Sequence, residues 1–217
     1  ADVVVAAYDP SWAPLEYTDT ETGMFSGVTS DLLSTFSRYT GLRFRFEPID
    51  QAEALEKVKK GLIDMVCSVT GDYLWDERNK MYTTRYYLRA PTMLVRTKQP
   101  HAIERIALQG GYWFSEHVAA DHPGKEIIFY KNVRECFDAL LKGDADAVYA
   151  NVYVTNYLLT ERRYESLAAT SMSKYTSEIC FGISKCADPR LLSILDKCIQ
   201  YTAPERMDEL VLKNTTK

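Results

Sequence analysis

The sequence contains one structural unit twice: Glu53-Ala-Leu-Glu-Lys-Val-Lys-Lys-Gly-Leu-Ile-Asp-Met-Val66 and Glu135-Cys-Phe-Asp-Ala-Leu-Leu-Lys-Gly-Asp-Ala-Asp-Ala-Val148. Each copy reads as an amphipathic helix, a glycine that ends the helix, and a buried strand that begins after an aspartate. One copy lies in each half of the chain, which predicts two related α/β lobes. The alternative is chance, because helix-glycine-strand units recur in many α/β proteins.

The segments before the first copy complete a lobe of the same kind. Residues 3–7 read as a short buried strand, residues 27–41 as a helix that ends at a glycine, and residues 43–47 as an alternating strand. The helix of the first copy, at residues 51–60, comes directly after them. The order β-α-β-α-β predicts a mostly parallel sheet flanked by helices.

Two extended segments, residues 89–96 and 178–184, predict crossings between the lobes. We therefore expect residues 1–92 and 183–217 to form lobe 1 and residues 93–182 to form lobe 2, with the last helix returning to lobe 1. Two crossing strands make a hinge, and the cleft between hinged lobes is where a small ligand binds.

Composition excludes several classes of partner. The 217 residues are 46% apolar and 26% charged, with a net charge of −4 and no run of Lys or Arg. Such a chain lacks the basic patch that nucleic acid or an anionic membrane requires. No apolar run approaches the roughly 20 residues of a membrane span. We expect a soluble chain, as a mature protein or an excised piece.

Nothing in the sequence favours a metal, a cofactor or catalysis. The five cysteines form no CxxC pair, and the apolar surroundings of Cys67, Cys136 and Cys180 favour buried free thiols. For Cys186 and Cys198, the sequence leaves open whether they form a disulfide with each other or stay free. The three histidines have no recognisable partner spacing, and no nucleotide-binding or hydrolase motif is present. We expect no cofactor, no metal and no enzyme.

Ligand-binding candidates lie where strands end, because parallel α/β lobes bind ligands beyond the carboxyl ends of their strands. Arg78 can hold a carboxylate with two parallel hydrogen bonds, or it can pair on the surface with Asp76 or Glu77. Ser68 and Thr70 offer hydroxyl groups at the end of the preceding strand.

Aromatic and glycine residues complete the candidate site. Trp12, between two prolines, can stack on a flat ligand or belong to the core, and Trp75 can form a second wall. Gly110, Gly111 and Tyr112 form a strand-to-helix turn whose backbone amides can receive an anion. All of these candidates are predictions from residue type and position.

Several motifs together resemble the type II periplasmic solute-binding proteins, that is, the bacterial extracellular solute-binding proteins of family 3 and their amino-acid-binding branch. Asp9-Pro-Ser-Trp-Ala-Pro-Leu-Glu-Tyr17 is similar to the DPxYAPF opening, Lys60-Gly-Leu-Ile-Asp64 to KxGxxD, and Leu108-Gln-Gly-Gly111 to LQGT. The resemblance covers the whole chain. It implies a two-lobed Venus flytrap fold in which Asp9, Trp12, Ser68, Thr70 and Arg78 face the ligand, with Arg78 on its carboxylate.

Three positions depart from the family pattern. The loop from Thr70 to Arg78 is about three residues longer than TxTPER, and Gly111 replaces a threonine. Asn151 stands where the family has an acid for the ligand's ammonium group, and a neutral amide cannot neutralise an ammonium.

Asn151 and the C-terminal sequence are more similar to sensor domains of histidine kinases and diguanylate cyclases. The resemblance implies an extracytoplasmic domain, tethered to a membrane-anchored output domain, that binds a small solute, an amino acid or another carboxylate, in the cleft between the lobes. One alternative is a solute-binding protein of an ABC transporter for amino acids. A less favoured alternative is an enzyme like cyclohexadienyl dehydratase, with Asp9 or Glu178 as the proton donor.

Overall fold

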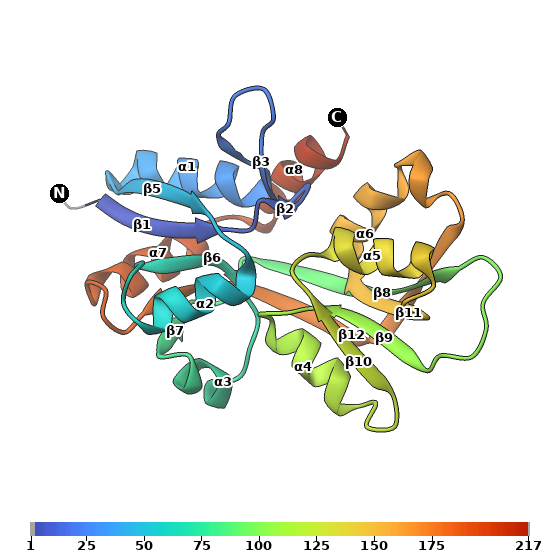
Figure 1. The fold of residues 1–217 in the computed structure, drawn as a ribbon. Helices are drawn as coiled ribbons and strands as arrows, with labels where there is room; N and C mark the ends of the chain where they lie inside the picture. The colour runs from blue at the N-terminus through green and yellow to red at the C-terminus, as the bar shows by residue number, and fades with distance from the viewer. Residues whose placement is uncertain (1–2, 217) are drawn as a thin grey trace.

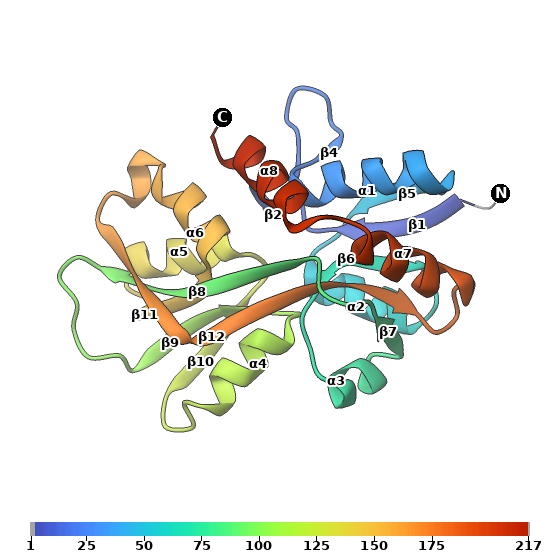
Figure 2. The ribbon, with the colours of Figure 1, turned by 180° about the vertical axis from the view of Figure 1, so that it is seen from behind.

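The computed structural model describes residues 3–216 and contains two α/β lobes side by side (Figures 1 and 2). The first lobe contains β1 (Val3–Tyr8), β2 (Ser11–Trp12), β3 (Glu16–Thr18), β4 (Phe25–Ser26), α1 (Val28–Thr40), β5 (Arg43–Pro48), α2 (Gln51–Lys59), β6 (Met65–Val69), α3 (Tyr73–Arg78) and β7 (Met81–Thr83). The second contains β9 (Arg105–Gln109), α4 (Trp113–Ala120), β10 (Glu126–Tyr130), α5 (Val133–Lys142), β11 (Ala147–Asn151), α6 (Val152–Leu159) and a 3-10 turn at Arg162–Tyr164. The strands that join them are β8 (Leu88–Thr97) and β12 (Leu167–Ser184), and the chain ends in α7 (Arg190–Gln200) and α8 (Pro204–Thr215).

The internal repeat is confirmed by the topology of the sheet. Its strand order is β10-β9-β11-β8-β12-β6-β1-β5, so each lobe has its first strand between its second and third strands, all parallel. The two repeated aspartates make the same contact: Asp64 accepts from the backbone amide of Val5 at 2.8 Å, and Asp146 accepts from that of Arg105 at 2.9 Å. Each aspartate therefore fixes the register of the third strand against the first strand.

Alternation along the buried strands divides the core between the two faces of each sheet. In lobe 1, Ala6 and Met65 lie in one apolar cluster with helix α1, whereas Ala7 and Val66 lie in another with helix α2. In lobe 2, α4 covers one face of the sheet and α5 with α6 covers the other (Figure 1). Buried parallel strands of this kind read as continuous apolar runs, as they do here.

Two strands longer than the extended segments of the sequence run between the lobes. Strand β8 pairs antiparallel with residues 167–172 and 176–179 of β12, and the end of β12 pairs with β6 and β7 of lobe 1. The predicted lobe boundaries at residues 92/93 and 182/183 lie within these two strands. The chain then returns to lobe 1, because α7 and α8 pack on α1 and Asn214 donates to Asp31 at 2.9 Å. Within residues 3–216 the chain passes between the lobes along these two strands alone.

Candidate functional site

The carboxyl ends of strands from both lobes meet at one place in the cleft. Asp9 follows β1 and Gln109 ends β9, and the Gln109 side-chain amide donates to Oδ2 of Asp9 at 2.7 Å. Both side chains are buried. The parallel arrangement explains the meeting, since the first strand of each lobe ends at the cleft edge of its sheet.

Tyr112 extends from lobe 2 into the cleft and contacts two predicted site residues of lobe 1. Its ring is stacked on Trp12, with centroids 5.5 Å apart and planes 21° apart. Its hydroxyl lies 3.2 Å from Oγ of Ser68, and the backbone amide of Phe114 donates to Oγ1 of Thr70 at 3.4 Å. The structure therefore brings Trp12, Ser68, Thr70 and Tyr112 together.

A cavity of about 30 Å³ remains between the lobes beside Tyr112. A cavity of this size holds only a few water molecules. Its walls come from both lobes and from the hinge strand β12, and the described residues that line it include no Lys, Arg, Asp, Glu or His: Trp12, Thr70, Gln109, Tyr112, Phe114, Ser115, Val133, Tyr149, Ala150, Asn151, Ser177 and Ile179. The site is thus walled by aromatic and aliphatic side chains together with hydroxyl and amide groups.

Of the two glycines before α4, only Gly111 lies where the two lobes are in close contact. Gly111 has a φ of +91°, and a Cβ added there would lie 2.6 Å from the backbone nitrogen of Ala52. Gly110 has room for a Cβ, because its nearest neighbour is the Tyr130 carbonyl oxygen at 3.7 Å. Gly111 is therefore the position at which the turn before α4 touches the start of α2 in lobe 1.

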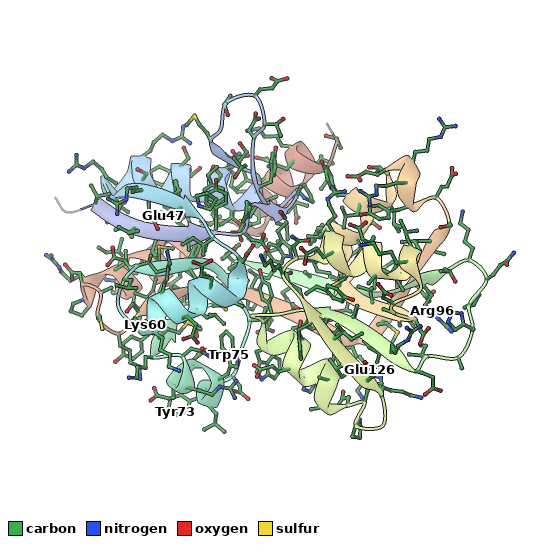
Figure 3. The ribbon with its side chains drawn as sticks, in the orientation of Figure 1. Glu47, Lys60, Tyr73, Trp75, Arg96 and Glu126 are labelled. Atoms are coloured by element: carbon green, nitrogen blue, oxygen red, sulfur yellow. The ribbon has the colours of Figure 1, made fainter. Side chains whose placement is uncertain are left out.

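Arg78 and Trp75 lie away from the cavity, at the edge of the cleft between α3 and α4. Both hold Glu116 of lobe 2: Nη2 of Arg78 donates to both carboxylate oxygens at 3.0 Å, and Nε1 of Trp75 donates to one of them at 2.7 Å. Figure 3 shows Trp75 on the side of α3 that faces α4. The arginine expected at a ligand carboxylate is paired with a carboxylate of the protein.

The segment predicted as a long loop after Thr70 is partly helical. Asp72 caps α3 by accepting from the backbone amide of Trp75 at 2.9 Å, and Gly71 lies against the Trp75 ring. The additional residues thus form the short helix that presents Trp75 and Arg78 to Glu116. A single sequence did not reveal this, because the capping aspartate lies among other acids.

Asn151 lines the cavity and also begins a helix. Its Oδ1 accepts from the backbone amides of Tyr153 and Val154, both at 3.0 Å, so it is the N-cap of α6. The carboxamide therefore turns its NH2 group away from those amides, and this group is a donor rather than an acceptor. Asn151 supplies no negative charge for a ligand ammonium group.

Two carboxyl groups of lobe 1, those of Asp9 and Glu16, are buried next to each other, and composition and motif did not identify Glu16 as part of the site. Glu16 accepts from the backbone amide of Asp9 at 3.1 Å, and among residues 3–216 its Oε2 meets no donor within hydrogen-bond distance, although the nearby Ser68 side chain favours the ionised form of Glu16. Burial raises the pKa of Asp9 to about 6 and the pKa of Glu16 to about 8. Glu16 stands in the quoted motif Asp9–Tyr17, but only the fold places it beside Asp9.

Asp9 and Glu178, the two candidate proton donors of an enzyme, differ in burial and in their hydrogen-bond partners. Asp9 is held by Gln109, whereas the Glu178 side chain is 56% exposed and lies 3.9 Å from Arg89. Among residues 3–216 no group of three or more His, Cys, Asp or Glu side chains could hold a metal ion, and no helix is long and apolar enough to cross a membrane. In the same part of the chain all five cysteines are free, with Cys67 and Cys136 buried and Cys180 partly exposed.

The chain is similar to proteins with this two-lobed architecture. One is the periplasmic VFT2 domain of BvgS from Bordetella pertussis, at 20% identity over 97% of this chain and 92% of that one, with a TM-score of 0.84. Another is the substrate-binding protein of an amino acid ABC transporter, at 19% identity over the full length of both chains, with a TM-score of 0.85. A third is the ancestral amino-acid-binding protein AncCDT-1, a precursor of cyclohexadienyl dehydratase, at 21% identity over 99% and 96%, with a TM-score of 0.80.

At these identities the structural likeness establishes the Venus flytrap fold. No curated protein matches the sequence. The family model described as bacterial extracellular solute-binding proteins, family 3, matches residues 4–213, which is nearly the whole chain. The chain therefore belongs to the bacterial extracellular solute-binding proteins of family 3.

Proposed function

We propose that this chain binds a small organic solute in the cleft between its lobes, outside the cytoplasm, as the sensor domain of a membrane signalling protein. The observation that carries the proposal is one cavity at the carboxyl ends of strands from both lobes. Gln109 and Asn151 line it, and Asp9 and Ser68 are hydrogen-bonded to its walls. Two continuous strands join these lobes, so a solute between them can bias a hinge motion.

The proposed solute is an amino acid or another carboxylate, as the family resemblance implies. A solute carboxylate has to compete with Glu116 for Arg78, because Nη2 of the guanidinium donates to both Glu116 oxygens at 3.0 Å. Arg78 lies at the edge of the cleft, so a solute whose carboxylate extends from the cavity to this edge exchanges an interlobe ion pair for an ion pair with the solute. This exchange removes a contact between the lobes, so a charged solute changes the equilibrium between open and closed arrangements.

A transporter is the second candidate, because the substrate-binding protein of an amino acid ABC transporter has the same fold. The two proposals share the site and differ in the context of the domain in the full-length gene. A transmembrane segment with an output domain supports the sensor, and a free or lipid-tethered protein encoded beside a permease supports the transporter. An enzyme is the least favoured candidate: Glu178 is 56% exposed beside Arg89, so only Asp9, which is buried and has a pKa raised to about 6, is placed to act as a proton donor.

Thermal unfolding with a panel of amino acids, dicarboxylates and aromatic acids tests solute binding. A solute that binds the native state adds RT ln(1 + [L]/Kd) to stability and raises Tm by about 3–6 °C at ten times its Kd for a chain of this size. Arg78→Ala is measured beside Arg38→Ala, which removes an exposed arginine from α1. We expect a carboxylate to lose affinity for Arg78→Ala alone; equal binding to both variants would contradict the role of Arg78, and no shift across the panel would contradict this solute class.

A further inference from the structure

Tyr112, the last residue of the turn before α4, has a large side chain that is buried in the cleft. It is 5% exposed, and its contacts cross from lobe 2 to the stacked ring of Trp12 and the hydroxyl of Ser68 in lobe 1. A phenol ring in this place gains apolar burial, aromatic stacking and one hydrogen bond at the same time. Those are the interactions that an aromatic ligand makes with a protein pocket.

The position of Tyr112 at the start of α4 indicates that its side chain contributes to the contact between the lobes rather than to the helix. Tyr112 is the N-cap residue of α4, yet its side chain makes no capping hydrogen bond. Among residues 3–216, three other helices begin with a side chain that does cap, namely Asp72, Asn132 and Asn151. Since Tyr is a poor N-cap residue, the helix loses stability here, and the cleft contacts offset that loss.

The space that Tyr112 occupies is continuous with the cavity between the lobes, which it lines together with Trp12 and Asn151. The remaining volume of about 30 Å³ is too small for any amino acid. The side chain therefore has to leave before a solute can lie on Trp12. A closed cleft without Tyr112 would enclose either a large apolar void or weakly bound water, both of which are costly.

We propose that Tyr112 is an internal occupant of the solute site: its phenol ring fills the closed cleft in the absence of solute, and the aromatic ring of the natural solute replaces it on Trp12 and Ser68. This inference rests on the proposed function and narrows the solute to one that carries a flat ring. Replacement needs the lobes to separate, because Gly111 next to Tyr112 is in close contact with Ala52. Solute binding and rearrangement of the turn before α4 are then one event.

Chemical rescue tests the proposal. Tyr112→Ser removes the ring and supplies a hydroxyl side chain that can cap α4, which favours a folded variant. We expect p-cresol to raise Tm of Tyr112→Ser by about 3–6 °C at ten times its Kd, and to leave the parent unchanged because Tyr112 occupies the site. Toluene, which lacks the hydroxyl that meets Ser68, should bind Tyr112→Ser more weakly.

Tyr201→Ser is the matched control, because Tyr201 is 83% exposed and follows the end of α7. No p-cresol stabilisation of folded Tyr112→Ser, or equal stabilisation of both variants, would overturn the proposal while leaving solute binding by the parent intact. If the parent binds no panel member but p-cresol stabilises only Tyr112→Ser, the Tyr112 ring fills the cleft as proposed, whereas the proposed solute class, and the replacement of Tyr112 by such a solute, are contradicted.

A second variant serves if Tyr112→Ser does not fold. Tyr112→Phe keeps the ring and loses only the hydrogen bond to Ser68, which is worth about 0.5–1.5 kcal/mol and corresponds to a 2–10-fold change in equilibrium. A weaker occupant is easier to displace. We therefore expect aromatic acids to bind Tyr112→Phe about 2–10-fold more tightly than the parent in calorimetric titration, and equal affinity would refute the replacement.

Discussion

The Gln109 side-chain amide donates to the buried carboxyl group of Asp9 across the cleft, at 2.7 Å between Nε2 and Oδ2. The bond joins the ends of β1 and β9, the equivalent first strands of the two repeats. Gln109 also donates to the Lys131 carbonyl at 3.2 Å, so one amide connects both lobes. This side chain is therefore a direct link between the repeats.

Replacing Gln109 should destabilise the closed arrangement. Gln109→Ala leaves the buried Asp9 carboxyl without its donor from lobe 2, and such a loss costs about 1–3 kcal/mol. Urea denaturation measures it, with Gln99→Ala as the control because Gln99 is an exposed residue outside the cleft. An equal effect of both substitutions would show that the Asp9 contact does not stabilise the protein.

Glu16 and Asp9 should make stability decrease as pH rises towards mild alkali. Burial raises the pKa of Glu16 to about 8 and that of Asp9 to about 6, so the folded state binds more protons than the unfolded state above pH 4.5. Their contribution is full below their unfolded pKa values and is lost as pH rises through 6 and then 8. Other groups that face this pair are Asp50, Tyr87, Tyr112 and Cys67, none of which is cationic.

The measurement is the free energy of unfolding at about pH 5.5, 7.0 and 8.5 for the parent, Glu16→Gln and Glu56→Gln. Glu16→Gln cannot ionise and should flatten the decrease, whereas Glu56 lies exposed on α2 and its replacement should preserve it. A decrease that persists unchanged in Glu16→Gln would exclude this residue as the source.

Much of the fold could be predicted from the sequence because local signals agree with the final structure. Gly143 ends α5 in the left-handed conformation, and Asp64 and Asp146 begin matched strands. The family motifs led to Trp12 and Ser68, and each of these lobe 1 residues contacts Tyr112 of lobe 2 across the cleft. These residues are identified by spacing and by position at strand ends.

The contacts between lobes could not be predicted from local signals. Glu116 lies in the first turn of α4, where an acid is ordinary, and only the arrangement of the two lobes brings it to Arg78 and Trp75, 38 and 41 residues away in sequence. Tyr112 similarly reads as one aromatic residue after two glycines. Its contact with Ser68 depends on the angle between the lobes, which no short pattern encodes.

Gly111→Ala should keep the lobes from closing. A Cβ at this position would lie 2.6 Å from the backbone nitrogen of Ala52, and a φ of +91° is unfavourable for alanine as well. We expect a larger radius of gyration in small-angle scattering and a red shift of the tryptophan emission, because Trp12 leaves Tyr112 and Trp75 leaves Glu116 when the lobes separate. Gly110→Ala is the matched control in the same turn, since its Cβ meets nothing closer than 3.7 Å; the same scattering curve for both variants would contradict a steric role for Gly111.

Glu116→Ala should weaken closure more than Arg78→Ala. The Arg78 side chain is 60% exposed, and an ion pair of this kind contributes about 0–1 kcal/mol, whereas Trp75 is buried and its indole N–H loses its acceptor when Glu116 is removed. A double-mutant cycle with urea denaturation separates the two contacts. Arg78→Ala should become neutral in the Glu116→Ala background because Glu116 is its partner across the cleft. If Arg78→Ala costs the same in both backgrounds, the arginine does not stabilise closure through Glu116, and it is free to act on a solute carboxylate alone.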